Sequence, residues 1–182
     1  MQTQTIKIEL LINGQKIAVG HQFLENMVSD IPDIKENSKI FEILAHSDNP
    51  DVRETLTRND MLNKKTIALL LEDESEDVVD GVLSNVDLAK QIEKEALYKI
   101  INANNIKLLS TIASNIEDYT LCDGCKLAKK LAKHPVAVVR YNLVRWRRVS
   151  SLISTKLLKK LAEDADCDVA KDAQGELESR ER

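Results

Sequence analysis

The clearest chemical spacing in this chain is a pair of cysteines in the segment Cys122-Asp123-Gly124-Cys125. Two thiols at this spacing serve either thiol–disulfide exchange or one half of a metal site. A structural zinc site needs four ligands, and the only further candidates are Cys167 and His134, which fall in turns later in the chain. We therefore expect ordinary helix-start cysteines, with no bound metal and no cofactor.

Other arrangements that carry catalysis are missing from the sequence. It contains no Gly-rich phosphate loop, no nucleophile elbow and no His-Glu-x-x-His motif. The three histidines, His21, His46 and His134, are scattered along the chain. The acidic run from Glu72 to Asp77 is typical of a solvated helix start, where carboxylates complement the helix dipole. We predict that the protein is not an enzyme.

Positive charge is concentrated in one segment of a chain whose net charge is −4. From Gly124 to Ala162 there is no acidic residue, whereas 11 of the 26 lysines and arginines fall there. They are Lys126, Lys129, Lys130, Lys133, Arg140, Arg145, Arg147, Arg148, Lys156, Lys159 and Lys160. Such a segment attracts an anionic partner and speeds its association.

The lysines of this segment are regularly spaced. Three pairs are each 30 residues apart, namely Lys126 and Lys156, Lys129 and Lys159, and Lys130 and Lys160. Three interpretations are open: a solvated outer face, a surface for an acidic protein, or a nucleic-acid contact over residues 126–160. Polar positions on the alternate helices are mixed in charge, which disfavours a groove lined for phosphates. We expect an acidic protein partner, with nucleic acid as the alternative.

The segment Arg145-Trp146-Arg147-Arg148 holds the only tryptophan of the chain, among three arginines. Because Trp and Arg are enriched at binding hot spots, we predict a partner contact here, together with Arg140 and Tyr141. The alternative is that Trp146 fills a gap between two repeats, with an arginine stacked on it or merely keeping it soluble.

The positions of these residues depend on a repeat that runs through the chain. The apolar pattern recurs every 30 residues over the last four copies, and after 27 residues one copy earlier. Two of its columns are Ile40, Ile67, Leu97, Leu127 and Leu157, and Val52, Val79, Leu109, Val139 and Val169. Within each copy, apolar pairs four residues apart mark two helices joined by a short turn. The pattern predicts an α-solenoid of about five two-helix repeats, each burying its apolar face against its neighbours.

The N-terminal region differs from the repeats. Residues 5–19 are two β-branched-rich runs around Asn13-Gly14, the favoured sequence of a type I′ hairpin turn. The hairpin either caps the first repeat or offers an edge for pairing with another chain. Residues 21–35 carry apolar residues at helical spacing. We therefore predict a hairpin and capping helix over residues 1–35 and helical repeats over 36–182, in one compact domain overall.

Two segments, residues 44–85 and 131–144, resemble the leucine-rich-repeat variant, a relative of HEAT-like helical repeats. The resemblance rests on a Leu-Ala pair, an Asp/His-Pro-like turn, and the pairs Val52-Arg53 and Val139-Arg140. It implies an all-α, right-handed α-solenoid (an α-α superhelix of the ARM type) that acts as a scaffold for protein interactions. The spacing of 30 is nearer to HEAT-like units, and three residues stand where arginine would be expected: Asp80, Ser110 and Ala170.

The composition fits a helical globular protein, with 43% hydrophobic, 31% charged and only 3% aromatic residues. The first residues lack the basic and apolar regions of a secretory signal, and no apolar run approaches the roughly 20 residues of a membrane span. Three cysteines give no disulfide framework. We expect a cytoplasmic protein, and the sequence leaves its oligomeric state open.

Overall fold

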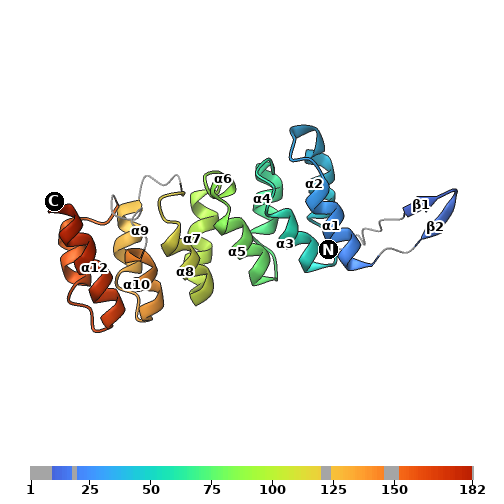
Figure 1. The fold of residues 1–182 in the computed structure, drawn as a ribbon. Helices are drawn as coiled ribbons and strands as arrows, with labels where there is room; N and C mark the ends of the chain where they lie inside the picture. The colour runs from blue at the N-terminus through green and yellow to red at the C-terminus, as the bar shows by residue number, and fades with distance from the viewer. Residues whose placement is uncertain (1–9, 18–19, 120–123, 146–151, 182) are drawn as a thin grey trace. The chain divides into compact units, whose positions relative to one another are not determined.

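Short α-helices arranged in successive pairs make up most of the chain (Figure 1). The computed structural model describes residues 10–17, 20–119, 124–145 and 152–181. The chain forms two compact units, residues 1–88 and 89–182. The predicted boundary at residue 35 falls inside the first unit, and the one compact domain predicted for the whole chain stays a prediction.

Unit 1 begins with two short strands and continues as helices. Its elements are β1 (Leu10–Ile12), β2 (Gln15–Ile17), α1 (His21–Asp30), a 3-10 turn (Lys35–Asn37), α2 (Ser38–Leu44), α3 (Pro50–Leu56), α4 (Lys64–Leu70) and α5 (Glu76–Ser84). Helices α1, α3 and α5 pack in a row, with α2 against α3 and α4 against α5. The unit is therefore a two-layer arrangement of helix pairs α2–α3 and α4–α5, preceded by α1.

The strands β1 and β2 pair antiparallel, with Leu10 opposite Ile17 and Ile12 opposite Gln15. Asn13 and Gly14 join them with φ of +50° and +74°, the positive values that a type I′ turn requires. The side chains of residues 12–17 are all exposed, so this part of the hairpin covers no helix. Its role as a cap or as a pairing edge stays a prediction.

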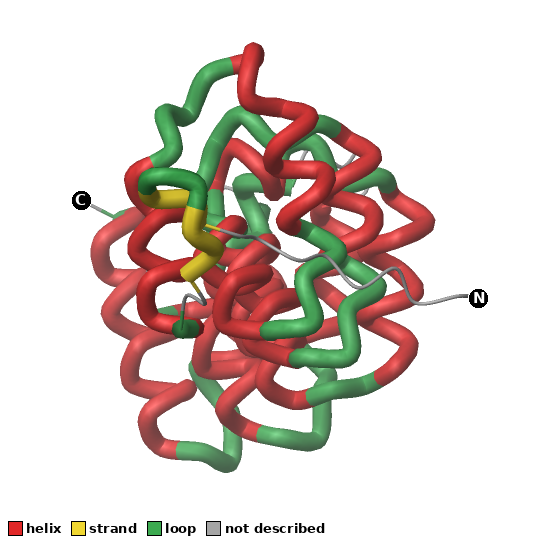
Figure 2. The backbone as a smooth tube through the Cα atoms, turned by 90° about the vertical axis from the view of Figure 1, so that its right-hand side faces the viewer, coloured by secondary structure: helices red, strands yellow, loops and turns green. Residues whose placement is uncertain are grey.

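Unit 2 is built from the same kind of helix pairs. Its elements are α7 (Lys94–Ala103), α8 (Ile106–Ser114), α9 (Gly124–Leu131), α10 (Ala137–Val144), α11 (Thr155–Leu161) and α12 (Cys167–Arg180), while the single turn α6 (Val86–Ala89) lies at the boundary. Helices α8, α10 and α12 pack in a row, and α9 contacts both α8 and α10. Short loops join the helices of each pair, as the colouring in Figure 2 shows.

The spacing of the repeats departs from the prediction by one residue at two places. The residues that cap the second helix of each pair are Asn49, Ser75, Asn105, Val136 and Asp166. They are separated by 26, 30, 31 and 30 residues, so the predicted intervals of 27 and of an invariant 30 were wrong there.

The apolar pattern of the sequence does not reveal the one-residue shift, because apolar residues occur in adjacent pairs. Val78 and Val79 are both buried, as are Leu108 and Leu109. An alignment of the repeats with or without the one-residue shift therefore matches one apolar residue with another. Ile40, predicted in the first apolar column, is 44% exposed, and its neighbour Phe41 is buried instead. The right-handed coil of the repeats stays a prediction.

Candidate functional site

Helices α9 and α11 carry the lysines that the sequence placed in register. We call this surface the basic face and define it by six residues, all exposed: Lys126, Lys129, Lys130, Lys156, Lys159 and Lys160. The two helices end alike: Ala132 donates to the carbonyl of Ala128 and Ala162 to that of Leu158, each at 2.9 Å. Because these bonds are 30 residues apart, the three lysine pairs occupy equivalent positions on the two helices.

Packing of the apolar sides of α9 and α11 leaves the lysines outside. In α9 the side chains of Leu127, Ala128 and Leu131 are buried, and in α11 those of Leu158 and Leu161. Leucine at three- and four-residue spacing gives each helix one core-facing side, so the lysines between them face solvent.

Four lysines of the basic face carry charge that the described residues do not pair. Lys129, Lys156, Lys159 and Lys160 make no ion pair within the described part of the chain. The ammonium of Lys130 donates to the Oδ1 atom of Asn102 at 3.0 Å, an uncharged acceptor. Exposed like charges at helical spacing repel one another weakly, and an anionic partner would relieve that repulsion.

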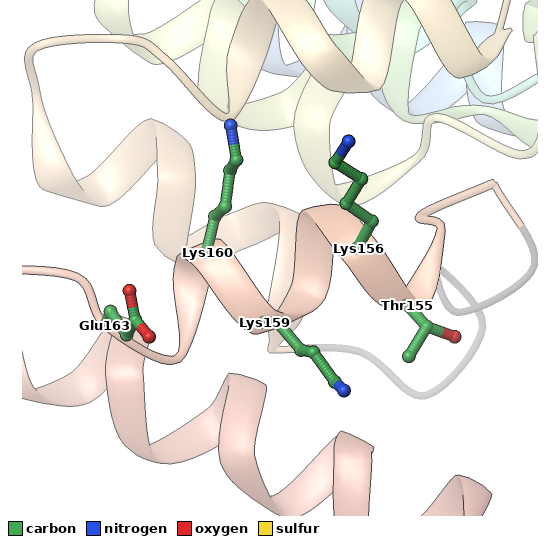
Figure 3. Close-up of a pocket in the computed structure, with 5 residues that line it drawn as sticks. All are labelled: Thr155, Lys156, Lys159, Lys160 and Glu163. Atoms are coloured by element: carbon green, nitrogen blue, oxygen red, sulfur yellow. The ribbon is translucent and has the colours of Figure 1, made fainter.

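A shallow depression of about 340 Å³ lies along α11 and is bounded by Thr155, Lys156, Lys159, Lys160 and Glu163. Figure 3 shows Lys156 and Lys160 pointing the same way, as residues four apart on a helix do, while Lys159 points to the other side. The depression offers three ammonium groups and one hydroxyl to an anionic group, with the carboxylate of Glu163 at its border.

Arg140, predicted as a partner contact, is bound inside unit 2. Its Nε and Nη2 atoms donate to the two carboxylate oxygens of Asp164 at 2.8 and 2.7 Å. Its Nη1 atom donates to the carbonyls of His134 and Pro135 at 2.7 and 2.9 Å. The side chain is 14% exposed, so Arg140 links two turns and presents little of itself to a partner.

We call this arrangement, an arginine bonded to an aspartate of the next turn, a clamp, and the same clamp occurs in unit 1. Arg53 donates to both carboxylate oxygens of Asp73, at 2.6 and 2.8 Å, and to the carbonyl of Ser47 at 2.6 Å. In each clamp the arginine lies four residues after the cap of its helix, and the aspartate lies two residues before the next cap. Each aspartate also accepts the N–H of that cap, Ser75 or Asp166.

Hydrogen bonding within the clamps shifts the pKa of Arg53, Arg140 and Asp164. The bonds from Arg140 lower the pKa of Asp164, and those to Asp73 and Asp164 raise the pKa of Arg53 and Arg140. In the other three second helices, the residues that lie four positions after the cap are Val79, Leu109 and Ala170, so no arginine occupies the clamp position there. The sequence spacing of 27 and 30 residues aligns Asp80 and Ser110 with the arginines instead, because it does not include the one-residue shift between caps. Pairing each arginine with an aspartate two residues before the next cap would have revealed the clamps.

Tyr141 and Arg145 lie together near the C-terminal end of α10. The Arg145 guanidinium carbon is 5.7 Å from the centre of the Tyr141 ring, within the range of a cation–π contact. Val144 and Arg145 also border a hollow of about 510 Å³ that extends along α12, where the charged lining residues are Lys171, Asp172, Glu176 and Glu178. The predicted contacts Trp146, Arg147 and Arg148 lie outside the described residues.

The cysteines and histidines show no catalytic arrangement where the structure describes them. Cys125 and Cys167 are exposed free thiols, and Cys122 lies outside the described residues. No group of three or more His, Cys, Asp or Glu side chains in the described ranges could hold a metal ion. His134 is a turn residue: its Nδ1 accepts the N–H of Val136 at 3.2 Å, and its Nε2 lies 3.1 Å from Asn104 Oδ1.

None of the helices in the described ranges has the length and apolar character to cross a membrane. No family model matches this chain, and no curated protein matches it. Among solved structures, the chain is similar to a designed armadillo repeat protein, YIII(Dq)4CqI, with 18% sequence identity and a TM-score of 0.36. The match covers 85% of this chain and 79% of the designed protein.

Proposed function

We propose that this chain is a non-enzymatic helical-repeat scaffold that binds an acidic protein partner through the basic face on α9 and α11. One observation carries the proposal: six exposed lysines stand in register on two helices, in a segment with no carboxylate from Gly124 to Ala162. Long-range attraction of this kind raises association rates and falls with ionic strength.

The composition of the basic face favours a surface that a partner recognises by its charge alone. All six residues are lysines, which act as flexible point charges, whereas arginine binds carboxylates and phosphates in a fixed two-pronged geometry. The two described clamp arginines are engaged internally. A partner held by lysines needs a high density of negative charge but no fixed arrangement of it, as in an acidic, extended protein segment.

A nucleic acid would also supply dense negative charge, and it is the alternative. The row of second helices in unit 2 disfavours it, because exposed or half-exposed positions there include Asp168, Asp172 and Glu178 beside Lys171. A protein that tracks phosphates carries a consistently basic surface.

The test measures binding of a labelled oligo-glutamate peptide to the full chain at low and moderate salt. We expect the triple variant Lys129→Gln, Lys156→Gln and Lys160→Gln to weaken binding at least about tenfold, since each lost charge contact contributes modestly. A matched control with the same change of net charge in unit 1, Lys35→Gln, Lys39→Gln and Lys64→Gln, should change it less than about twofold.

Equal losses of peptide affinity in the two triple variants would show that binding depends only on the net charge of the chain, and this result would overturn the proposal. Tighter binding of a single-stranded oligonucleotide of the same charge, with a steep salt dependence lost in the first variant, would support the nucleic-acid alternative.

We also propose that Trp146 and Arg147, predicted from the sequence as partner contacts, take part in binding. Replacing Trp146 and Arg147 with alanine should leave the helical circular dichroism and the thermal midpoint unchanged and should reduce capture of the protein partner. An unfolded double variant would instead show that Trp146 belongs to the core.

A further inference from the structure

Unit 1 carries an acidic counterpart to the basic face. Six exposed carboxylate residues lie on its α2–α3 and α4–α5 turns and the helix starts that follow, and we call them the acidic edge: Asp48, Asp51, Glu72, Glu74, Glu76 and Asp77. Two pairs occupy equivalent positions, because Asp48 and Glu74 each precede a cap and Asp51 and Asp77 each follow one by two residues. No lysine or arginine occurs in residues 47–51 or 71–78.

The Arg53 clamp holds the two acidic turns side by side. Arg53 bonds to the carbonyl of Ser47 in one turn and to the carboxylate of Asp73 in the next. The charges of Glu74 and Asp48 both raise the pKa of Arg53, in keeping with their position beside it. Since Asp73 neutralises Arg53, the exposed carboxylates keep their net negative charge.

Two carboxylates of the acidic edge have no bonded partner. Asp48 and Glu74 make no hydrogen bond or ion pair through their side chains among the described residues. The same holds for Lys156 and Lys160 on the basic face. Both surfaces therefore present charges that no described residue of the chain pairs.

The two surfaces match in spacing as well as in sign. Each extends over two successive helix pairs, so in both surfaces the two rows of charge are one repeat apart. Unit 1 has eight basic and 17 acidic residues, and unit 2 has 18 basic and 13 acidic residues. Opposite net charges on the units favour the approach of one molecule's unit 1 to another molecule's unit 2.

We propose that a second copy of this chain is a partner, with the acidic edge of one copy docked on the basic face of the other. The inference rests on the proposed function of the basic face and names an occupant for it. The contact is heterologous, so each pair retains one free edge and one free face and adds further copies at high concentration. Because the ion pairs are exposed, the association is weak and disappears in high salt.

Sedimentation of the full chain at low and high salt, with two charge-reversal variants, tests the inference. One variant carries Lys156→Glu and Lys160→Glu on the basic face, and the other carries Asp48→Lys and Glu74→Lys on the acidic edge. We expect the unaltered chain at low salt to exceed its monomer mass of 20.5 kDa as concentration rises. Each variant alone should remain a monomer at the same concentration.

The mixture of the two variants gives the decisive result. The first keeps its acidic edge and the second keeps its basic face, so an equimolar mixture should associate to at least a one-to-one heterodimer of twice the monomer mass. A mixture that stays monomeric, or an unaltered chain that stays monomeric at low salt, would overturn the inference.

Failure here is distinguishable from failure of the proposed function. If the unaltered chain stays monomeric while oligo-glutamate still binds to the basic face, only the second copy is excluded as the partner. If neither associates, both proposals are wrong. Circular dichroism of both variants should match that of the unaltered chain, and the heterodimer itself would show that each variant is folded.

Discussion

The guanidinium of Arg140 and the carboxylate of Asp164 show how single residues fix the spacing of two turns. A planar arginine fork bonded through two nitrogens to two oxygens gives both attraction and a defined geometry. The Arg140 and Asp164 side chains are 14% and 10% exposed, so the pair is well shielded from water. Removing one partner would leave a partly buried charge unpaired, which costs more than an exposed ion pair contributes.

Replacing Arg140 with methionine should therefore lower the free energy of unfolding by about 2 kcal/mol, measured by urea denaturation. The methionine keeps most of the apolar stem, so the loss reports the hydrogen bonds and charge. Arg145→Met, at the exposed C-cap of the same helix, is the matched control and should change stability by less than about 0.5 kcal/mol. Equal effects of the two substitutions would contradict the role of the clamp.

The Asp164 carboxyl makes part of this stability dependent on pH. Hydrogen bonds from Arg140 lower its pKa in the folded state below the ordinary value of 3.8, so the unfolded chain binds the proton more readily. The contribution is fully present above that value and is lost as pH falls through the lower folded pKa.

Unfolding of the chain and of Asp164→Asn should therefore differ most near neutral pH and converge in acid. The measurement is urea denaturation of both proteins at pH 7 and at pH 3. A stability difference that stayed constant between the two pH values would show that Asp164 acts without its charge.

At the scale of helices, two glycines in helix interiors have opposite surroundings. A Cβ atom on Gly81 in α5 would lie 2.2 Å from the Oγ1 and 3.0 Å from the Cβ of Thr57. Thr57 is buried and donates to the Glu54 carbonyl at 2.7 Å, so it is held in place. Gly175 in α12 has nothing within 4 Å of the same position.

Gly81→Ala should destabilise unit 1, because α3 and α5 must move apart or Thr57 must give up its hydrogen bond. We expect a loss of about 1–3 kcal/mol, measured by chemical denaturation. The double variant with Thr57→Ala tests the cause, since removing the Oγ1 atom, which lies nearest to the added Cβ, should recover part of the loss. No recovery would mean that the close approach lies elsewhere.

Gly175→Ala should stabilise unit 2 by about 0.5–1 kcal/mol, because alanine restricts the unfolded chain and fits the open helix surface. Thermal unfolding followed by circular dichroism measures the shift. A destabilising effect would show that the backbone of α12 is closely packed at Gly175.

The helical elements could be predicted from the sequence because apolar spacing and turn residues act locally. Asn13-Gly14 has the positive φ angles that its sequence favours, and the basic face holds the register expected from the lysine spacing. The one-residue shift between the third and fourth caps could not be predicted, since doublets such as Leu108-Leu109 align in either register. Arg140 was assigned to a partner because its sequence neighbours are basic, whereas Asp164, 24 residues later, binds it.

At the scale of the whole molecule, charges in different places have different roles. Charges inside the clamps fix the spacing of turns, and charges left outside on α9 and α11 are available to a partner. The protein is therefore expected to keep its fold in salt that abolishes its binding, because shielded pairs are screened much less than exposed ones. Circular dichroism and peptide binding across a salt series would show this separation, and a parallel loss of both would contradict it.

The basic face is tested most directly by observing where an acidic ligand binds. Nuclear magnetic resonance of the isotope-labelled chain, titrated with oligo-glutamate at low salt, reports each backbone amide separately. The account predicts that the largest shifts fall on α9 and α11, around Lys129, Lys156 and Lys160, and that they vanish in high salt. Shifts centred instead on the α12 hollow beside Arg145, or spread evenly over all lysines of the chain, would contradict it.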